Sequence, residues 1–200
     1  MQRTDEEIDE AFVRAAIAGD HAAFAALYAR HRARVAARLG HLLGPSALVD
    51  DLVQDTFLRA HRALPAFRGD CPFRFWLLRI ATHAARGARR SLRRALWRLF
   101  ADPSEERALA GRVAAAAEAY PELVAVHAAL DRLSPVLREA IVLFELEGRT
   151  LQEIALELGV SIHTVGARVR RGRVALRREL VRTGGALGRR ALLPCPGGPA

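Results

Sequence analysis

The 200-residue sequence contains no lysine, so arginine supplies all 31 of its Lys/Arg side chains. Cysteine is scarce too, and Cys71 and Cys195 are not expected to form a disulfide framework. There is no run of about 18 apolar residues. Residues 1–10 are acidic and polar, where a signal peptide would be basic and then apolar. We therefore expect a cytoplasmic protein with no membrane insertion.

Patterns typical of enzymes and metal proteins are missing as well. The seven histidines form no HExxH motif, and His21, His31 and His41 would not share one face of a helix. The sequence has neither the glycine pattern of a P-loop nor a CxxC pair. We expect no catalytic residue, no metal site, no cofactor and no small-molecule substrate, so the chain is not expected to be an enzyme.

Alanine and positive charge are abundant. Alanine favours helices, whereas the β-branched and aromatic residues that favour strands are sparse, with aromatics at 6%. The formal net charge is +9 at pH 7. Arginine side chains match phosphate oxygens and guanine edges. The composition therefore predicts an all-α protein with a nucleic-acid partner.

Helix start and stop signals divide the chain into two helical parts. In the first part, Thr4 and Glu7 form a capping box, Asp20 is placed to cap a second helix, and Gly40 is expected to end that helix. Pro72 suits the first position of a later helix. The predicted fold is all-α. Residues 1–100 and 122–183 are expected to form two small helical domains, residues 101–121 the linker between them, and residues 184–200 a disordered tail.

A helix predicted between residues 46 and 65 has an acidic outer face in an otherwise basic protein. Its acidic residues are Asp50, Asp51 and Asp55. Leu52, Phe57 and Leu58 are expected to face the core. Aspartates near a helix start also complement the helix dipole, so the pattern alone does not establish a binding surface.

The following helix carries the opposite charge. Residues 73–100 include no acidic residue, and their arginines are at positions 74, 79, 86, 89, 90, 93, 94 and 98. A solvated helix face usually mixes charges of both signs, so an unbroken basic run indicates a polyanionic partner. Phe73 and Trp76 lie at helical spacing on the apolar face and are expected to belong to the core.

The clearest motif is a helix-turn-helix between residues 150 and 173. Thr150 and Glu153 form a capping box, Gly159 is expected to turn the chain, and Ser161 is placed to cap the second helix. That second helix keeps a basic, hydrogen-bonding face once its buried positions are set aside. Such a face fits the major groove of duplex DNA.

Three stretches carry a resemblance to a known family. They are DDLVQDTFLRAHRAL (50–64), FRFWLLRIATHAARGARR (73–90) and LSPVLREAIVLFELEGRTLQEIALELGVSIHTVGARVRRGRVALRREL (133–180). These stretches are similar to the successive conserved segments of extracytoplasmic-function (ECF) sigma factors of the sigma-70 family, and the resemblance covers about residues 5–182. It implies a transcription initiation factor that binds core RNA polymerase, directs it to promoter DNA and assists melting, with an anti-sigma factor as a further partner.

The resemblance also implies three surfaces. The acidic helix would bind the clamp coiled coil of the polymerase β′ subunit through Asp50, Asp51, Leu52, Gln54, Asp55 and Leu58. Residues 66–90 would engage the minus-ten element and capture an unstacked base, with Arg68, Arg74, His83, Arg86, Arg89 and Arg90 as candidates. The helix-turn-helix would read the minus-thirty-five duplex and contact the β flap, with Ser161, His163, Thr164, Arg168, Arg170, Arg171 and Arg173 as candidates.

The chain departs from the family pattern at a few positions. His83 and Gly87 stand where members commonly carry Asn and Asp, and Gly166 and Ala167 occupy sites that often hold polar or basic readers. We therefore assign base reading to Arg170 and Arg171, and phosphate contacts to Arg168 and Arg173.

The main alternative is a polymerase-independent regulator whose helix-turn-helix binds an operator as a dimer. That reading leaves the acidic helix and the basic fourth helix without a joint purpose. For the free sigma-like chain we expect the two halves to pack together and mask their DNA-binding faces.

Overall fold

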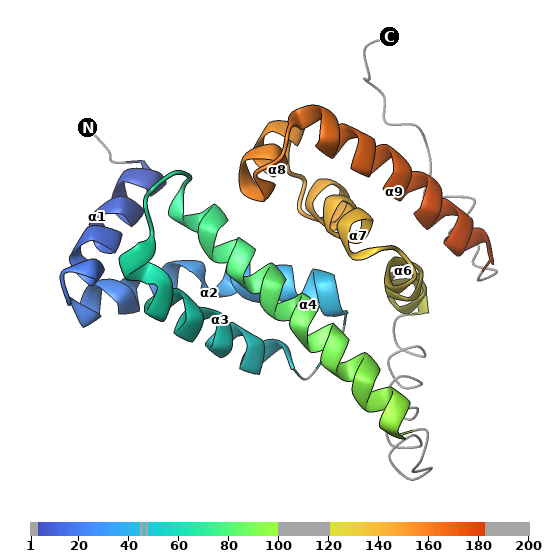
Figure 1. The fold of residues 1–200 in the computed structure, drawn as a ribbon, viewed down its shortest axis with the longest axis horizontal. Coiled ribbons are helices and arrows are strands. Elements are labelled where there is room, and N and C mark those ends of the chain that lie inside the picture. Colours follow the sequence, from blue (N-terminus) through green and yellow to red (C-terminus); the bar gives the residue numbers. More distant parts are fainter. Residues whose placement is uncertain (1–3, 45, 47, 100–120, 183–200) are drawn as a thin grey trace.

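The computed structural model describes residues 4–44, 46, 48–99 and 121–182, and every element in these ranges is helical. The elements are α1 (Asp5–Ile17), α2 (His21–Leu43), α3 (Val49–Ala63), the 3₁₀ turn η1 (Leu64–Ala66), α4 (Phe73–Leu99), α6 (Pro121–Asp131), α7 (Pro135–Ile141), the π-turn η2 (Val142–Leu146), α8 (Leu151–Leu158) and α9 (Ile162–Arg182). Figure 1 shows α1–α4 gathered into one unit, with α6–α9 forming a second unit beside α4.

In the N-terminal unit (α1–α4), the first two helices begin where their capping residues predict. Thr4 and Glu7 form the expected capping box, and Asp20 Oδ1 accepts hydrogen bonds from the backbone N–H groups of Ala22 and Ala23. The core contains apolar side chains of all four helices, including Val13, Leu27, Leu39, Phe57 and Leu77. Burying each of the large ones contributes roughly 1.5–3 kcal/mol. Phe57 and Phe73, both predicted to face the core, belong to it, and Leu52 and Trp76 pack against it.

Two local predictions are wrong. Gly40 does not end the second helix: α2 continues to Leu43, and Gly44 ends it with a φ of 77°, in the region that favours glycine. Leu58, expected to face inward, has 58% of its surface exposed, whereas Phe57 beside it is buried. Successive residues point about 100° apart on a helix, and here Phe57 takes the inward direction while Leu58 points to solvent.

The C-terminal unit (α6–α9) contains the predicted helix-turn-helix in α8 and α9. Thr150 and Glu153 form the capping box, and Gly159 adopts the left-handed conformation with φ 64° and ψ 37°. Val165 is fully buried. Gly172 lets α9 approach α7, because a Cβ built there would lie 2.6 Å from Ile141 Cγ1.

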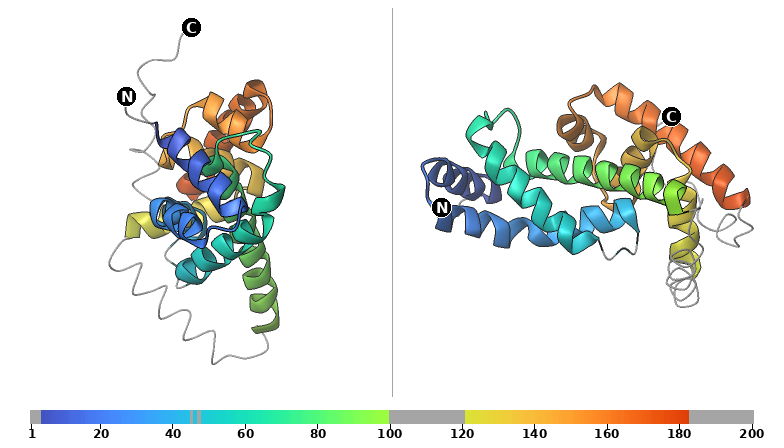
Figure 2. Two further views of the ribbon diagram at one scale, coloured as in Figure 1. Left: turned by 90° about the vertical axis from the view of Figure 1, so that its left-hand side faces the viewer. Right: turned by 60° about the horizontal axis from the view of Figure 1, so that its bottom comes forward.

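The two units pack against each other along a continuous seam. Leu130, Ile141 and Val142 of the C-terminal unit belong to the same apolar cluster as the N-terminal core. In the right-hand view of Figure 2, α4 lies between its own unit and the C-terminal helices. The structure thus agrees with the expectation that the two halves pack together.

Candidate nucleic-acid interface

The outer face of α3 is acidic and open to solvent. Asp50, Asp51 and Gln54 are exposed, while Leu52 and Asp55 are half-buried. Asp55 Oδ2 lies 2.8 Å from Arg59 Nη2, one turn further along the helix. The predicted residues of this face therefore lie together on one helix.

An apolar pocket adjoins this acidic face. It has a volume of about 440 Å³ and is lined by Phe24, Tyr28, Gln54, Phe57, Leu58 and His61. Phe57 packs edge-on against Tyr28 with ring centroids 4.6 Å apart. Exposed Leu58 is thus one wall of a hollow formed by α2 and α3. Leu58 was wrongly predicted to face the core. The same side chain was also predicted to contact the polymerase, and the structure leaves it exposed at this hollow.

The loop before α4 combines aromatic rings with arginines. Arg68 donates hydrogen bonds of 3.0 and 2.7 Å to Asp70, and Arg79 Nη2 lies 3.7 Å from Cys71 Sγ. Trp76 is half-buried, and its ring centroid lies 4.9 Å from that of Phe67.

Phe73 and Trp76 have different environments. Phe73 is 4% exposed and belongs to the core as predicted, whereas Trp76 borders an open cleft. Arg74 pairs with Glu6 of α1, and its guanidinium lies 4.5 Å from the ring centroid of Phe75. Trp76 is therefore the better placed of the two predicted core aromatics to meet a ligand.

Further along α4, the predicted arginines have different environments. His83 and Arg90 are exposed. Desolvation by the surrounding protein, and then the positive charges of neighbouring arginines, lower the pKa of His83 below its ordinary 6.5. Arg86 pairs with Glu139, and Arg89 Nη1 donates to Asp131 Oδ1 at 2.6 Å. Two of the candidate DNA-binding arginines are thus bound to carboxylates of the C-terminal unit.

The recognition helix α9 starts with an ordered cap. Ser161 Oγ accepts a hydrogen bond of 3.2 Å from the Thr164 backbone N–H, and the two hydroxyl oxygens lie 2.9 Å apart. His163 is exposed beside this cap. The first turn therefore presents polar groups in fixed positions.

The arginines of α9 fall into two classes. Arg170 and Arg171 are exposed, whereas Arg168 is half-buried. Arg173 Nε donates to Glu145 Oε1 at 2.5 Å, and its guanidinium lies 5.1 Å from the ring centroid of Phe144. Arg170 and Arg171, assigned above to base reading, are thus the most accessible arginines in this half of the helix.

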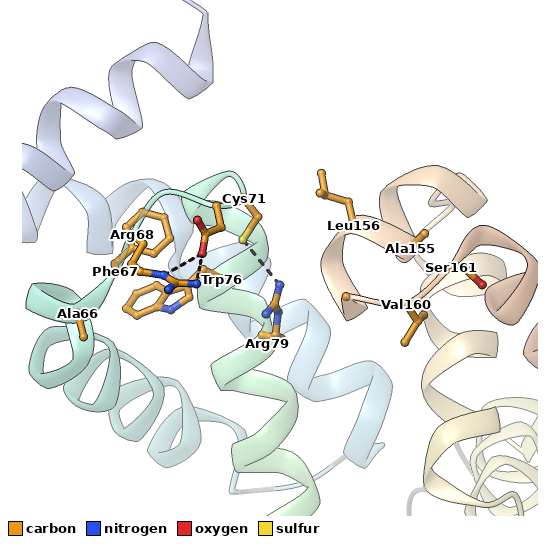
Figure 3. A pocket seen from close by; sticks show the side chains of 12 residues that line it. Ala66, Phe67, Arg68, Cys71, Trp76, Arg79, Ala155, Leu156, Val160 and Ser161 are labelled. Atoms are coloured by element: carbon orange, nitrogen blue, oxygen red, sulfur yellow. Dashed lines mark hydrogen bonds and ion pairs between the residues drawn. The ribbon is translucent and has the colours of Figure 1, made fainter.

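The loop and the helix-turn-helix face each other across a cleft of about 770 Å³. Figure 3 shows Phe67, Arg68 and Trp76 on one side, with Leu156 and Ser161 on the other. One candidate residue of each predicted DNA-binding surface, Arg68 and Ser161, therefore lines this cleft.

Sequence reasoning missed the residues that join the units. Arg38 is 1% exposed and is bound by Glu147 and Glu157, which lie more than a hundred positions away. One signal was present: Arg38 lies in the same helical register as buried Val35 and Leu42.

The described residues include no helix that is both long enough and apolar enough to cross a membrane. In the same ranges, no three His, Cys, Asp or Glu side chains are grouped so that they could hold a metal ion.

Comparison with known proteins identifies both units. A family model described as "Sigma-70 region 2" matches residues 27–95, and one described as "Sigma-70, region 4" matches residues 123–176. These matches coincide with α2–α4 and with most of the C-terminal unit.

Individual relatives match nearly the whole chain. RNA polymerase sigma factor NccH of Alcaligenes xylosoxydans xylosoxydans is 37% identical over 185 residues, covering 86% of this chain and 95% of the relative. The ECF RNA polymerase sigma-E factor of Escherichia coli (strain K12) is 32% identical over 181 residues, covering 86% and 94%. A solved structure of CnrH in complex with the cytosolic domain of CnrY has 31% identity and a TM-score of 0.62, covering 89% of this chain and 99% of that one.

Proposed function

This chain belongs to the ECF group of the sigma-70 family of RNA polymerase sigma factors, and we propose that it binds core RNA polymerase and directs it to specific promoters. One observation carries the proposal: an acidic face with an apolar pocket on α3 is spatially separate from the arginine-rich faces of α4 and α9. A chain that joins a protein to a nucleic acid needs two such surfaces of opposite charge.

The α3 surface is proposed to bind the β′ clamp coiled coil. Its acidic side chains suit a basic partner, and the pocket beside Leu58 can take an apolar side chain from it. Buried apolar anchors supply most of the affinity in such contacts, while rim charges mainly speed association. Leu58 is therefore proposed as the anchor, with Asp50, Asp51, Leu52, Gln54 and Asp55 around it.

The loop before α4 is proposed to hold an unstacked base of the minus-ten element. Opening base pairs costs a few kcal/mol per step, and stacking a base on an aromatic ring returns roughly 1–3 kcal/mol. Trp76 and Phe67 lie beside Arg68 and Arg79 at the cleft, so rings and cations are available together. The other proposed contacts are Arg74, His83, Arg86, Arg89 and Arg90.

The helix-turn-helix is proposed to read the minus-thirty-five duplex. The exposed arginines Arg170 and Arg171 suit base edges, and Arg168 and Arg173 suit phosphates. Ser161, His163 and Thr164 are proposed to contact the DNA at the first turn of α9, and the β flap is proposed to bind the same unit.

Further parts of the proposal follow from the family. We infer a sigma region 2 domain over residues 1–100 and a region 4 domain over residues 122–183, joined by linker 101–121. The linker and the proposed tail, residues 184–200, lie almost entirely outside the described residues. An initiation factor has no reaction of its own, so the chain is proposed to be no enzyme and to act in the cytoplasm with the polymerase. An anti-sigma factor is proposed as a regulator, in keeping with the bound CnrY domain in the CnrH structure.

The polymerase-independent regulator is not favoured. The family matches cover the N-terminal unit as well as the helix-turn-helix, and a free-standing regulator would have no use for the α3 surface.

Run-off transcription with purified core polymerase on a genomic promoter library tests the proposal. The chain should produce discrete transcripts whose promoters share two elements. Leu58→Arg should weaken binding to core by about ten- to a hundredfold, because it places a cation and a longer side chain in the anchor pocket. Ile17→Arg, at an apolar residue that is also exposed, is the matched control and should leave core binding unchanged. Failure of the purified chain to bind core would contradict the proposal.

A further inference from the structure

We propose that Asp9 and His31 are positioning residues for base capture: this buried pair holds three aromatic rings in the arrangement that receives an unstacked base. The rings are those of Phe67, Phe73 and Trp76, called the aromatic platform below. The inference rests on the proposed function, because it takes Trp76 and Phe67 to be the residues on which the base stacks. Asp9 and His31 are each 4% exposed, so they act through the platform and not by touching the base.

Each ring of the platform contacts the other two. The ring centroids lie 6.0 Å apart for Phe67 and Phe73, 4.9 Å for Phe67 and Trp76, and 5.7 Å for Phe73 and Trp76. All three distances fall in the range that favourable aromatic pairs adopt. Phe73 is buried and is the inner ring, whereas Phe67 and Trp76 are half-buried and line the open cleft (Figure 3). A base can therefore reach the two outer rings, and the inner ring fixes where they lie.

His31 supports the inner ring from a different helix. Its ring centroid lies 5.5 Å from that of Phe73, and the two ring planes are tilted by 60°. Phe73 is the first residue of α4, so no preceding turn of that helix lies beneath its side chain. Phe67 comes from the segment that leads into α4. The support for this end of the platform therefore comes from α2.

The orientation of the His31 ring is set by Asp9. His31 Nε2 lies 2.8 Å from Asp9 Oδ2, and Arg30 Nε donates to Asp9 Oδ1 at 3.0 Å. A rotated imidazole would leave a buried carboxylate oxygen without its partner, which is strongly unfavourable. Asp9 belongs to α1, which precedes the residues 27–95 matched by the region 2 model. The inference therefore gives α1 a role in base capture.

A fixed platform matters because stacking has to offset the cost of unstacking the base from the DNA. A ring that is already in place stacks without losing further conformational freedom, whereas a mobile ring must be ordered first, and part of the stacking free energy is lost. Loosening Phe73 would loosen both outer rings at once, since both contact it. The pair should therefore affect the binding of bases more than the binding of phosphates.

Two substitutions separate the two contacts of His31. His31→Gln removes the ring from Phe73 but keeps an amide N–H group that can donate to Asp9. Asp9→Asn keeps the ring but removes the charge that holds it. Leu39→Ala is the matched control, because Leu39 is fully buried in the same helix, about 12 Å further along it, and its truncation destabilises the core away from His31. Circular dichroism shows whether each variant keeps its helices.

Trp76 reports directly on the order of the platform. The sequence has two tryptophans, Trp76 and Trp97, so a Trp97→Phe background leaves Trp76 as the only one. Time-resolved fluorescence anisotropy of the full-length free chain should show more nanosecond motion of the Trp76 ring in H31Q and in D9N than in the background chain. L39A should leave that motion unchanged. A folded H31Q or D9N chain with an equally rigid Trp76 would overturn the inference.

Base capture is measured with two fluorescein-labelled single DNA strands of equal length, one of random sequence and one in which every nucleotide is abasic. Both carry the same phosphates, so the ratio of their dissociation constants reports the bases alone. The background chain should bind the base-bearing strand at least about fivefold more tightly, and H31Q and D9N should lower this ratio towards one without weakening binding of the abasic strand. L39A should keep the ratio. A ratio near one in the background chain, or an unchanged ratio in H31Q or D9N, would also overturn the inference.

Run-off transcription with core separates this inference from the proposed function. Transcripts that fall in H31Q and D9N but not in L39A, together with a loosened Trp76 and a lowered ratio, support both. If no chain yields transcripts but H31Q and D9N still loosen Trp76 and lose the preference for bases, the positioning role stands and the proposed function fails.

Discussion

Asp9 is a carboxylate buried between α1 and α2, where an unpaired charge would cost several kcal/mol. Its oxygens lie 2.8 Å from His31 Nε2 and 3.0 Å from Arg30 Nε. Burial acts to raise the pKa of Asp9, but the hydrogen bonds and charges of His31 and Arg30 outweigh it and hold that pKa below the ordinary 3.8. Asp9 therefore stays ionised and attaches α1 to α2.

Asp9→Asn is expected to lower the free energy of unfolding at pH 7 by about 1.5–3 kcal/mol, because it removes the charge from two hydrogen bonds. A lowered pKa means that the stabilisation is present above pH 3.8 and is lost as the pH falls through the lowered value. Urea unfolding should therefore show a smaller difference near pH 3 than at pH 7.

Asp5→Asn is the matched control for this prediction, since Asp5 also bonds to Arg30 but is an exposed residue of the same helix. Its effect should stay below about 1 kcal/mol. A D9N chain as stable as the wild type at pH 7 would contradict the role given to Asp9.

Gly172 is required by packing rather than by backbone conformation. An added Cβ would lie 2.6 Å from Ile141 Cγ1 and 3.3 Å from the Leu137 carbonyl oxygen. Gly172→Ala gains up to about 1 kcal/mol of helix propensity but overpacks the contact between α7 and α9, which costs about 1–3 kcal/mol. Thermal unfolding should show a net loss of stability.

Gly166→Ala is the control in the same helix. The added Cβ meets only Arg170 Nη1, at an ordinary 3.6 Å, so this substitution should be neutral or stabilising. Equal melting temperatures for G172A and G166A would refute the packing argument.

At the scale of the element, α9 combines a structural and a reading face. Val165, Val169 and Leu180 are buried on one side, and Arg170 and Arg171 are exposed elsewhere around the helix. A single helix can serve both purposes because its side chains repeat every 3.6 residues. The proposed roles of its arginines can therefore be tested without disturbing the core.

Arg170→Ala and Arg171→Ala in the holoenzyme should each cost about 1–3 kcal/mol at the minus-thirty-five element and relax specificity there. Arg168→Ala should instead weaken binding about equally on all sequences and reduce the salt slope by about one. Promoter binding across a set of minus-thirty-five variants and salt concentrations measures both effects. The same loss of specificity for all three substitutions would show that the division between bases and phosphates is wrong.

For α2, sequence signals predicted the start correctly and the end incorrectly. Asp20 caps the first turn through its own side chain, a contact that involves only nearby residues. Gly40 and Gly44 are equally plausible ends by composition. The packing decided, because Leu42 is needed in the core and the chain turns only after it.

On the scale of the whole molecule, His127 lies half-buried at the seam next to Gly44, and its Nδ1 has no hydrogen-bond partner among the residues that the structure describes. Burial lowers the pKa of His127 below 6.5; the negative charge of Asp131 opposes this shift, whereas the electrostatic effects of His41 and Arg89 add to it. The form in which the two units are packed together, called the closed form, therefore binds a proton on His127 less tightly than an open form with separated units would. Closure should weaken as the pH falls below 6.5.

The radius of gyration of the free chain measured between about pH 8 and pH 5 tests this expectation. His127→Gln stays neutral and should remove the part of the pH response that lies just below 6.5. Burial raises the pKa values of Glu139 and Asp131 above their ordinary 4.5 and 3.8. Protonation of these two carboxylates in acid therefore favours the closed form, which is opposite to the effect of protonating His127. The difference between wild type and H127Q isolates the histidine, and identical pH curves would contradict its role.

The sequence by itself determined the helices, the helix-turn-helix, the charge of each face and the family, because capping, periodicity and turn residues act over a few positions. The resemblance also proposed Leu58 as a contact residue, and the structure leaves that side chain exposed. The tertiary structure alone decided which charges meet. Arg89 and Asp131 are 42 positions apart and Arg38 and Glu157 are 119, so no local pattern pairs them. Only the packing of the two units brings these groups together, and it buries Arg38 and Glu157, where each charge requires a partner.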